Sequence, residues 1–379
     1  MKKLVYIGFI LFFGVLKVHA NIDSDRLSLR EKIGQMLIMG FSGAEVNEHS
    51  AVVRSLHDDN IGGVILFDYN FQTKRFDKNI KSPEQTKQLN LILQQEAFNS
   101  NHANQRPQLP LLISVDYEGG QVNRLKPAYG FPETISAQAF SELAVNDAQR
   151  TANDMANTLK ENGFNLDFAP VLDVNVNPEN PVLGKLERSY SADPHRVIES
   201  SSLLANALKS QKIGCAYKHF PGHGSSKSDS HLGFVDVTES WQEYELLPYQ
   251  ALVSHMGSKD MIMTAHIVNR HLDASGLPAT LSQPILTGLL RQKLGFQGVI
   301  ITDDMQMKAI SEHYGLEESM VLAINAGADM FIFGNQLVNE PMPAAKLIDF
   351  IEKNVRNGKI SQGKINDSVH RITALKQAL

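Results

Sequence analysis

The chain has 379 residues, of which 42% are hydrophobic and 20% are charged, as in an ordinary folded globular protein. The formal net charge of −5 at pH 7 argues against a nucleic-acid-binding protein, which would need a basic face. A chain of this length fits either one large barrel or two domains.

The first residues have the pattern of an export signal. Two lysines precede an apolar run over residues 4–16, and a small-residue cleavage site that ends at Ala20 follows. The run is shorter than the ~20 apolar residues of a transmembrane helix. We therefore predict a signal peptide over residues 1–20, a mature domain over residues 21–379 without a membrane span, and a periplasmic or secreted protein. Lys17 leaves an uncleaved anchor open as the alternative.

Short apolar runs alternate with segments of helical periodicity along the whole mature chain. Most of the runs are continuously apolar, as expected for parallel strands that are buried on both faces. The predicted strands cover residues 36–39, 63–67, 111–115, 166–172, 215–218, 261–265, 299–302 and 330–333. The predicted helices cover residues 82–99, 147–162, 197–212, 243–256, 282–294 and 317–325.

Repeated alternation of strands and helices indicates a parallel sheet. The fold class is therefore α/β, and eight such units fit a single (β/α)8 TIM-type barrel. A doubly wound open sheet is the rival fold. It would favour a glycine-rich phosphate loop after the first strand, and the sequence has none there.

Cys215 is the one cysteine of the sequence, so it cannot form an internal disulfide. Because it lies in a predicted strand, it is expected to be a small core residue. An exported chain of this size without disulfides indicates the bacterial periplasm.

Polar residues gather where the predicted strands end. They are Asp116, Asp173, Lys218, His219, His266, Asp303 and Asp304. In a barrel the carboxyl ends of the strands form the rim on which active sites are built. We therefore predict one convergent site. Because neighbouring side chains of a strand point to opposite sides, Asp303 and Asp304 should differ in role, as a nucleophile and an orienting group, unless both are structural caps.

The segment from Lys218 to Gly224 holds two basic groups and a loop shaped by glycine and proline. Asp229 and His231 follow it as a carboxylate and imidazole pair, which can move a proton. The simpler interpretation is a polar surface loop. His219, His223, His231 and the more distant His266 could bind zinc, but the first strand lacks a His-x-His motif and Lys218 would repel a cation, so no metal is predicted. Gly119 and Gly120 indicate a turn, so no nucleotide or other cofactor is predicted.

Several motifs together resemble those of glycoside hydrolase family 3, in particular its single-domain β-N-acetylglucosaminidase (β-hexosaminidase) branch. The resemblance covers about residues 30–375. The motifs are residues 115–120 with Arg124, residues 167–173, residues 187–190, residues 218–224, residues 229–231 and residues 302–305.

This resemblance implies a function and roles for individual residues. Asp303 would be the nucleophile that forms a covalent glycosyl–enzyme, and His231 the general acid/base with Asp229 as its partner. The residues that would hold the terminal N-acetyl sugar are Asp116, Arg124, Arg188, Lys218 and His219. Gln121 stands where many relatives carry arginine, and residues 225–228 are particular to this chain, which leaves the fine substrate preference open.

The residue types fit retaining hydrolysis of a glycoside. Such enzymes need a carboxylate nucleophile and an acid/base beside the leaving oxygen. An imidazole, with an ordinary pKa of about 6.5, suits proton donation and return near neutral pH. We therefore expect a β-N-acetylhexosaminidase that releases N-acetylglucosamine from muropeptides or chitin oligosaccharides. Hydrolysis is expected, although phosphate could compete with water because a histidine replaces the usual carboxylate.

Two other functions remain open. A β-glucosidase or β-xylosidase of the same family would normally carry a second domain after the barrel, and Leu379 ends the chain too early for it. A catalytically inactive sugar-binding barrel would lose Asp303 or His231, and both are present. A monomer with a carbohydrate substrate and no nucleic-acid partner is expected.

Overall fold

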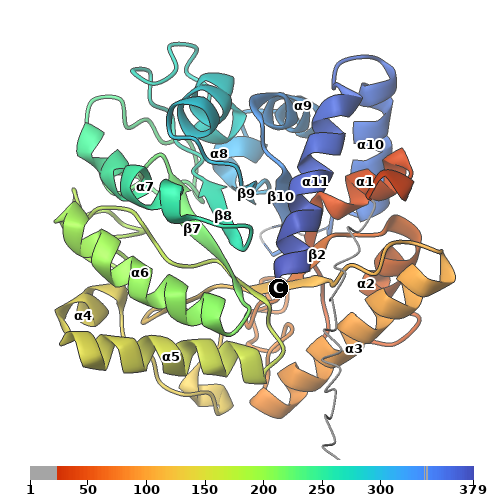
Figure 1. The fold of residues 1–379 in the computed structure, drawn as a ribbon, viewed down its shortest axis with the longest axis horizontal. Coiled ribbons are helices and arrows are strands. Elements are labelled where there is room, and N and C mark those ends of the chain that lie inside the picture. Colours follow the sequence, from red (N-terminus) through yellow and green to blue (C-terminus); the bar gives the residue numbers. More distant parts are fainter. Residues whose placement is uncertain (1–23, 337, 339) are drawn as a thin grey trace, which may run out of the picture.

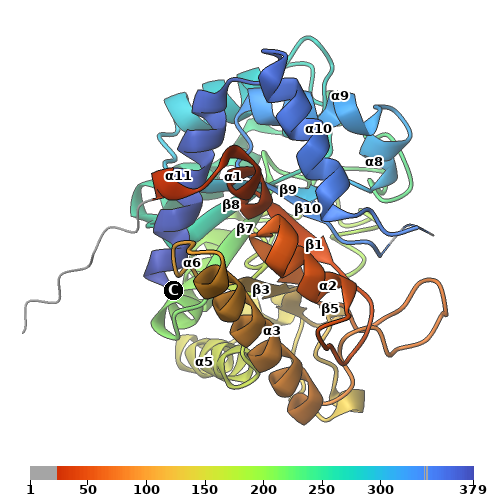
Figure 2. The ribbon, with the colours of Figure 1, turned by 90° about the vertical axis from the view of Figure 1, so that its right-hand side faces the viewer.

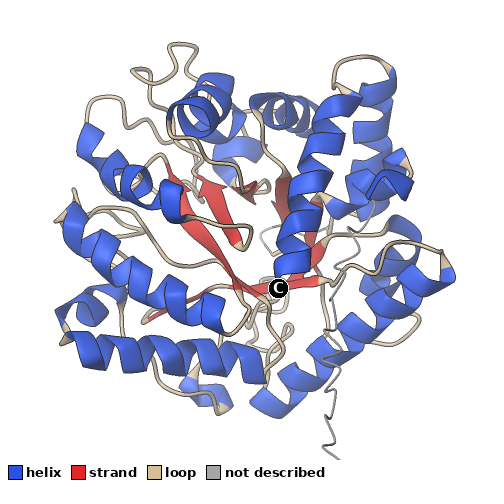
Figure 3. Ribbon diagram, in the orientation of Figure 1, coloured by secondary structure: helices blue, strands red, loops and turns tan. Residues whose placement is uncertain are grey.

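The computed structural model describes residues 24–336, 338 and 340–379, and the predicted signal peptide and its cleavage site at Ala20 lie outside them. Within the described residues, eight parallel strands close into a barrel in the order β1-β10-β9-β8-β7-β6-β3-β2. Figures 1 and 3 show these strands at the centre, with the helices around them. The predicted (β/α)8 barrel is confirmed, and the alternative of an open sheet is wrong.

Every predicted strand forms part of the barrel. The barrel strands are β1 (Leu37–Gly40), β2 (Gly63–Ile65), β3 (Leu112–Val115), β6 (Leu166–Asp167), β7 (Gly214–Phe220), β8 (Asp260–Thr264), β9 (Val299–Asp304) and β10 (Met330–Phe333). The ring closes because β1 pairs with β10 on one side and β2 on the other. At this closure a side chain on Gly40 would lie 1.7 Å from the carbonyl oxygen of Gly334, so only glycine fits there.

Helices cover the outside of the barrel. The α-helices are α1 (Leu29–Gln35), α2 (Ala51–Arg54), α3 (Pro83–Ala103), α4 (Ala137–Glu142), α5 (Val145–Glu161), α6 (Pro194–Ser210), α7 (Leu247–Leu252), α8 (Lys308–Ser311), α9 (Leu316–Ala326), α10 (Ala344–Arg356) and α11 (Gln362–Ala378). Shorter or wider helical turns are η1 (Ser24–Arg26), η2 (Ser55–Asp59), η3 (Pro127–Tyr129), η4 (Glu243–Leu246), η5 (Val253–His255), η6 (Ala279–Leu281) and η7 (Pro284–Lys293). In Figure 2, α1 lies beside α10 and α11, so the two ends of the described chain pack together.

Two predicted elements differ from the structure, and proline explains both. The helix predicted over residues 243–256 is divided into η4, α7 and η5. Pro248 has no backbone N–H to donate to the preceding turn, so a regular α-helix can begin only there. The strand predicted over residues 166–172 keeps regular pairing only over Leu166–Asp167, because Pro170 interrupts it.

The core prediction for Cys215 is confirmed, since its side chain is buried and burial raises the pKa of its thiol. A hairpin of β4 (Tyr117–Gly119) and β5 (Val122–Asn123), which was not predicted, follows β3 and shapes one wall above the barrel. Among the residues that the structure describes, none of the helices has both the length and the apolar character needed to cross a membrane.

Candidate active site

A cavity of about 400 Å³ opens at the carboxyl ends of the barrel strands. The eight residues to which the family resemblance gave roles line it, whereas Asp173 and His266, two of the predicted strand-end residues, do not. The eight are Asp116, Arg124, Arg188, Lys218, His219, Asp229, His231 and Asp303. They come from β7 and β9, from the residue after β3 and from the loops after β5, β6 and β7, so side chains from several strand ends meet at this cavity.

One wall of the cavity is a buried cluster of opposite charges. The Lys218 ammonium lies 2.9 Å from the Asp116 carboxylate and 2.7 Å from the Glu118 carboxylate. Arg188 donates two hydrogen bonds of 2.8 Å to Glu118 in a forked arrangement. Burial alone would raise the pKa of both acids, but the neighbouring cations outweigh it, lowering the pKa of Asp116 and bringing that of Glu118 to about 2.

The two acids of this cluster have different access to the cavity. The Glu118 side chain is only 3% exposed and its oxygens are occupied by Lys218 and Arg188. The Asp116 side chain is 17% exposed, and Arg124 lies 3.5 Å from its second oxygen with 30% of its own side chain exposed. Asp116 and Arg124 can therefore still accept and donate hydrogen bonds to a bound polar ligand.

Glu118 is a site residue that the sequence analysis missed, although it lies inside one of the quoted motifs. Because its pKa is lowered from 4.5 to about 2, its carboxylate stabilises the fold fully above pH 4.5 and progressively less as the pH falls toward 2. We expect Glu118→Gln to lower the free energy of unfolding at pH 7 by about 3–5 kcal/mol, since it leaves Arg188 without its buried partner. Urea unfolding at pH 7 and pH 3 measures this.

The matched control is Glu161→Gln, an exposed glutamate at the end of α5. It should unfold like the unmodified protein at both pH values. If Glu118→Gln lost as much stability between pH 7 and pH 3 as the unmodified protein, the ion cluster would not be the source of the acid sensitivity.

His219 is held in one orientation by a buried carboxylate. Its Nδ1 lies 2.6 Å from Asp173, which also accepts a hydrogen bond of 3.1 Å from the His219 backbone N–H. Arg188 lies 3.5 Å from Nε2, the nitrogen on the opposite side of the ring. Asp173, which was predicted as a strand-end residue, orients the His219 ring at the cavity.

Asp229 and His231 form the predicted pair. The Nδ1 atom of His231 lies 2.7 Å from Asp229, which also accepts a hydrogen bond of 2.8 Å from the His231 backbone N–H. Burial lowers the pKa of His231, but the Asp229 hydrogen bond and the Asp303 charge outweigh it and raise that pKa above 6.5. Because the Asp229 contact uses Nδ1, Nε2 is the nitrogen that can exchange a proton with a ligand, and the side chain is 49% exposed.

The loop that carries this pair is anchored below by His223. Its Nδ1 lies 2.7 Å from the Ser226 hydroxyl, its Nε2 lies 3.3 Å from the Ser230 hydroxyl, and its backbone N–H donates to Asp173 at 2.7 Å. Burial and the His219 charge lower its pKa to about 4, so the ring is neutral near pH 7 and can both donate and accept. His223 does not line the cavity, and its role is to connect the two ends of the loop.

Asp303 and Asp304 both line the cavity, although the alternation along β9 predicts opposite sides, and they differ in environment. For Asp303, His266, His219 and His231 outweigh the effect of burial and lower its pKa. Asp304 accepts a hydrogen bond of 3.0 Å from the Gln306 backbone N–H, and burial raises its pKa to about 7. Asp303 is therefore the ionised carboxylate, and Asp304 holds the turn after β9.

His266 is engaged below the cavity rather than in it. Its Nε2 lies 3.0 Å from the Asp304 carbonyl oxygen and its Nδ1 lies 2.8 Å from the Thr280 hydroxyl. In the part of the chain that the structure describes, no three histidine, cysteine, aspartate or glutamate side chains are grouped as metal ligands would be.

The closed barrel and a rim cavity with a carboxylate, a histidine–carboxylate pair and charged groups for hydroxyls define the class of barrel glycoside hydrolases. The comparisons with known proteins agree. The chain belongs to glycoside hydrolase family 3, because residues 28–375 match the model of the glycosyl hydrolase family 3 N-terminal domain.

Similar proteins of known family are named β-hexosaminidases or β-N-acetylglucosaminidases. The chain is 31% identical to β-hexosaminidase A of Pseudoalteromonas piscicida, over 96% of this chain and 64% of that protein. It is 33% identical to a β-hexosaminidase of Tolumonas auensis, over 79% and 82% of the two chains. Its fold matches a family 3 β-N-acetylglucosaminidase from a Paenibacillus strain with a TM-score of 0.81, at 33% identity over 93% of this chain and 62% of that one. This chain thus spans less than two thirds of the Pseudoalteromonas and Paenibacillus proteins.

Proposed function

We propose that the protein is a retaining β-N-acetylhexosaminidase that releases terminal N-acetylglucosamine from β-linked glycans. The observation that carries the proposal is the placement of ionised Asp303 and the His231–Asp229 pair around a single cavity. The names of the family 3 relatives support the sugar type.

In the first step the Asp303 carboxylate attacks the anomeric carbon of the bound sugar. The bond to the leaving oxygen breaks while protonated His231 gives that oxygen its proton, so a covalent glycosyl–aspartate and the free alcohol result. In the second step neutral His231 takes a proton from water, which attacks the anomeric carbon and releases Asp303. The Asp229 carboxylate stabilises the imidazolium and keeps the proton on Nδ1 when His231 is neutral.

The charged wall of the cavity holds the sugar in place for this attack. Asp116 accepts hydrogen bonds from sugar hydroxyls, and Lys218, Arg124, Arg188 and His219 can donate to hydroxyl or acetyl oxygens. Because the ion pairs already order these side chains, little conformational entropy is lost when the sugar binds.

Asp229 should control the alkaline limb of the pH profile. The acid form of His231 is lost as the pH rises through its pKa, which Asp229 helps to raise. We therefore expect Asp229→Asn to shift the alkaline fall of kcat/KM to lower pH, because it removes that carboxylate. Profiles of kcat/KM with an aryl N-acetyl-β-glucosaminide measure the shift. Asp236→Asn removes a carboxylate from the same segment but outside the cavity and should leave the limb in place.

The proposed activity is tested with matched aryl glycosides. The N-acetyl-β-glucosaminide should be cleaved, with the β-anomer of the free sugar as first product by NMR, and the glucoside and xyloside should be poor substrates. Preference for the latter two would favour the β-glucosidase or β-xylosidase alternative. Binding without turnover would favour an inactive sugar-binding barrel. Added phosphate should yield no sugar 1-phosphate if water is the acceptor.

We also propose that the protein acts outside the cytoplasm as a monomer, on peptidoglycan fragments or chitin oligosaccharides. The amino-terminal export pattern supports the location. Amino-terminal sequencing of protein from the periplasm or medium should begin at Asn21.

A further inference from the structure

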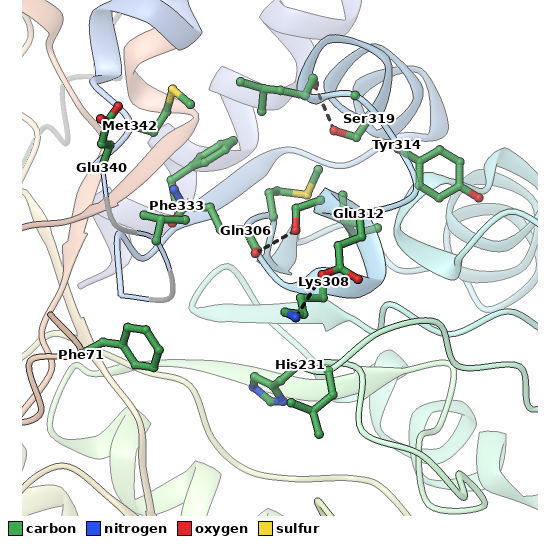
Figure 4. Close-up of a pocket in the computed structure, with 17 residues that line it drawn as sticks. Phe71, His231, Gln306, Lys308, Glu312, Tyr314, Ser319, Phe333, Glu340 and Met342 are labelled. Carbon is green, nitrogen blue, oxygen red and sulfur yellow. Dashed lines mark hydrogen bonds and ion pairs between the residues drawn. The ribbon is translucent and has the colours of Figure 1, made fainter. Parts of the chain in front are cut away.

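A second and larger cavity, of about 510 Å³, adjoins the sugar cavity. It lies over the loops that follow β9 and β10 and over α8. His231 and Phe71 line both cavities, and Figure 4 shows them along one border of the larger one. The two cavities therefore meet at the imidazole that is proposed to protonate the leaving oxygen.

We propose that this second cavity binds the aglycone, and that it selects a neutral sugar such as a second N-acetylglucosamine over an aglycone that carries carboxylates. The inference rests on the proposed function. An acid/base must lie beside the leaving oxygen, so the group on the far side of that oxygen begins next to His231. The larger cavity begins at the same place.

The lining of the cavity suits a ring with apolar faces. Phe71 is 49% exposed and Leu232, the residue after His231, is 72% exposed, although both are large and apolar. The other apolar residues of the lining include Met305, Ile310, Tyr314, Phe333 and Met342. The C–H faces of a pyranose and the methyl of an acetyl group can bury apolar area against such side chains. Exposed apolar groups beside a catalytic histidine are best explained by a bound partner.

The charges of the cavity argue against an anionic aglycone. Among the described residues that line it, Lys308 is the one lysine or arginine, and its ammonium lies 3.0 Å from the Glu312 carboxylate. Figure 4 shows this pair on the cavity wall. Glu340, also in the lining, is exposed and adds a negative charge. Among the described lining residues, the Lys308 and His231 cations are each already paired with a carboxylate, Glu312 and Asp229, so a carboxylate on the aglycone would be disfavoured.

The first test compares two disaccharides that differ in one group. Chitobiose has a neutral second sugar, whereas N-acetylglucosaminyl-N-acetylmuramic acid carries a lactyl carboxylate on it. We expect kcat/KM for chitobiose to be at least about tenfold higher. Glu312→Gln frees Lys308 and should raise the ratio of kcat/KM for the carboxylated disaccharide to kcat/KM for chitobiose by about threefold. Glu161→Gln changes the net charge equally, away from the cavity, and should alter neither.

The second test fills the cavity. Ser311 ends α8, is exposed and lines the cavity, and Ser210 ends α6, is exposed and lies outside it. Ser311→Trp should lower kcat/KM for chitobiose at least about tenfold more than kcat/KM for N-acetyl-β-glucosaminyl fluoride, whose leaving group is a single atom. Ser210→Trp should change neither substrate.

Outcomes for this inference and for the proposed function are separable. Failure to cleave the aryl N-acetyl-β-glucosaminide would overturn the proposed function itself. If that substrate is cleaved but Ser311→Trp leaves chitobiose unaffected, the second cavity does not bind the aglycone. If the carboxylated disaccharide is cleaved as well as chitobiose, the selection for a neutral sugar is wrong.

Discussion

Replacing Asp303 with alanine should lower kcat for an aryl N-acetyl-β-glucosaminide by about 10⁴-fold or more, because the covalent step loses its nucleophile. The space that the removed Asp303 side chain leaves below the sugar admits a small anion. We expect azide to restore part of the turnover and to give the α-glycosyl azide, since it attacks from the face that Asp303 occupied. Product anomers are assigned by NMR, and circular dichroism checks that the variant is folded.

The neighbouring aspartate provides the control for this result. Asp304 follows Asp303 directly but accepts the Gln306 backbone N–H, so its replacement should affect the turn after β9 and gain nothing from azide. An α-azide product from Asp304→Ala, with Asp303→Ala still active, would assign the nucleophile to Asp304 and overturn the proposal.

Replacing His231 with alanine should separate substrates by their leaving groups. A general acid contributes about 10²–10⁴-fold when the leaving oxygen needs a proton. We therefore expect kcat/KM for chitobiose to fall by at least about 10²-fold, and that for an activated aryl glycoside to fall far less. Azide should now give the β-glycosyl azide, because it replaces the water that His231 activates on the opposite face from Asp303.

The control here is His195→Ala, which removes an exposed histidine at the start of α6. It should behave as the unmodified protein with both substrates. Equal losses on chitobiose and on the aryl glycoside in His231→Ala would show that the histidine binds the sugar and does not transfer the proton. An α-azide product would likewise contradict the assignment.

Much of the site could be predicted because barrel geometry converts a position in the sequence into a position in space. Asp116, Lys218 and Asp303 lie at the ends of apolar runs, and parallel strands bring such ends to the same rim. The close pair of Asp229 and His231 needed no long-range information, since a single residue separates them in one loop.

Other features depend on contacts that the sequence does not display. Glu118 and Arg188 are 70 residues apart, and nothing in either neighbourhood predicts their forked ion pair. His219 and His223 belong to the same short motif, residues 218–224, yet the His223 ring anchors a loop and the His219 ring faces the cavity. The strand predicted over residues 166–172 shows the opposite case, because Pro170 was a visible signal against a strand and the mostly apolar residues around it outweighed that signal.

The sequence by itself determined the number of barrel strands, the boundaries of all of them except β6 to within two residues, and most of the residues that reach the rim. It could do so because burial on both faces requires continuous apolar runs, which are local properties. Only the tertiary structure decided which charged groups form buried ion pairs with one another and which remain available to a ligand. It also revealed the second cavity beside His231, because a cavity is the space between loops from separate strands and no single segment encodes it.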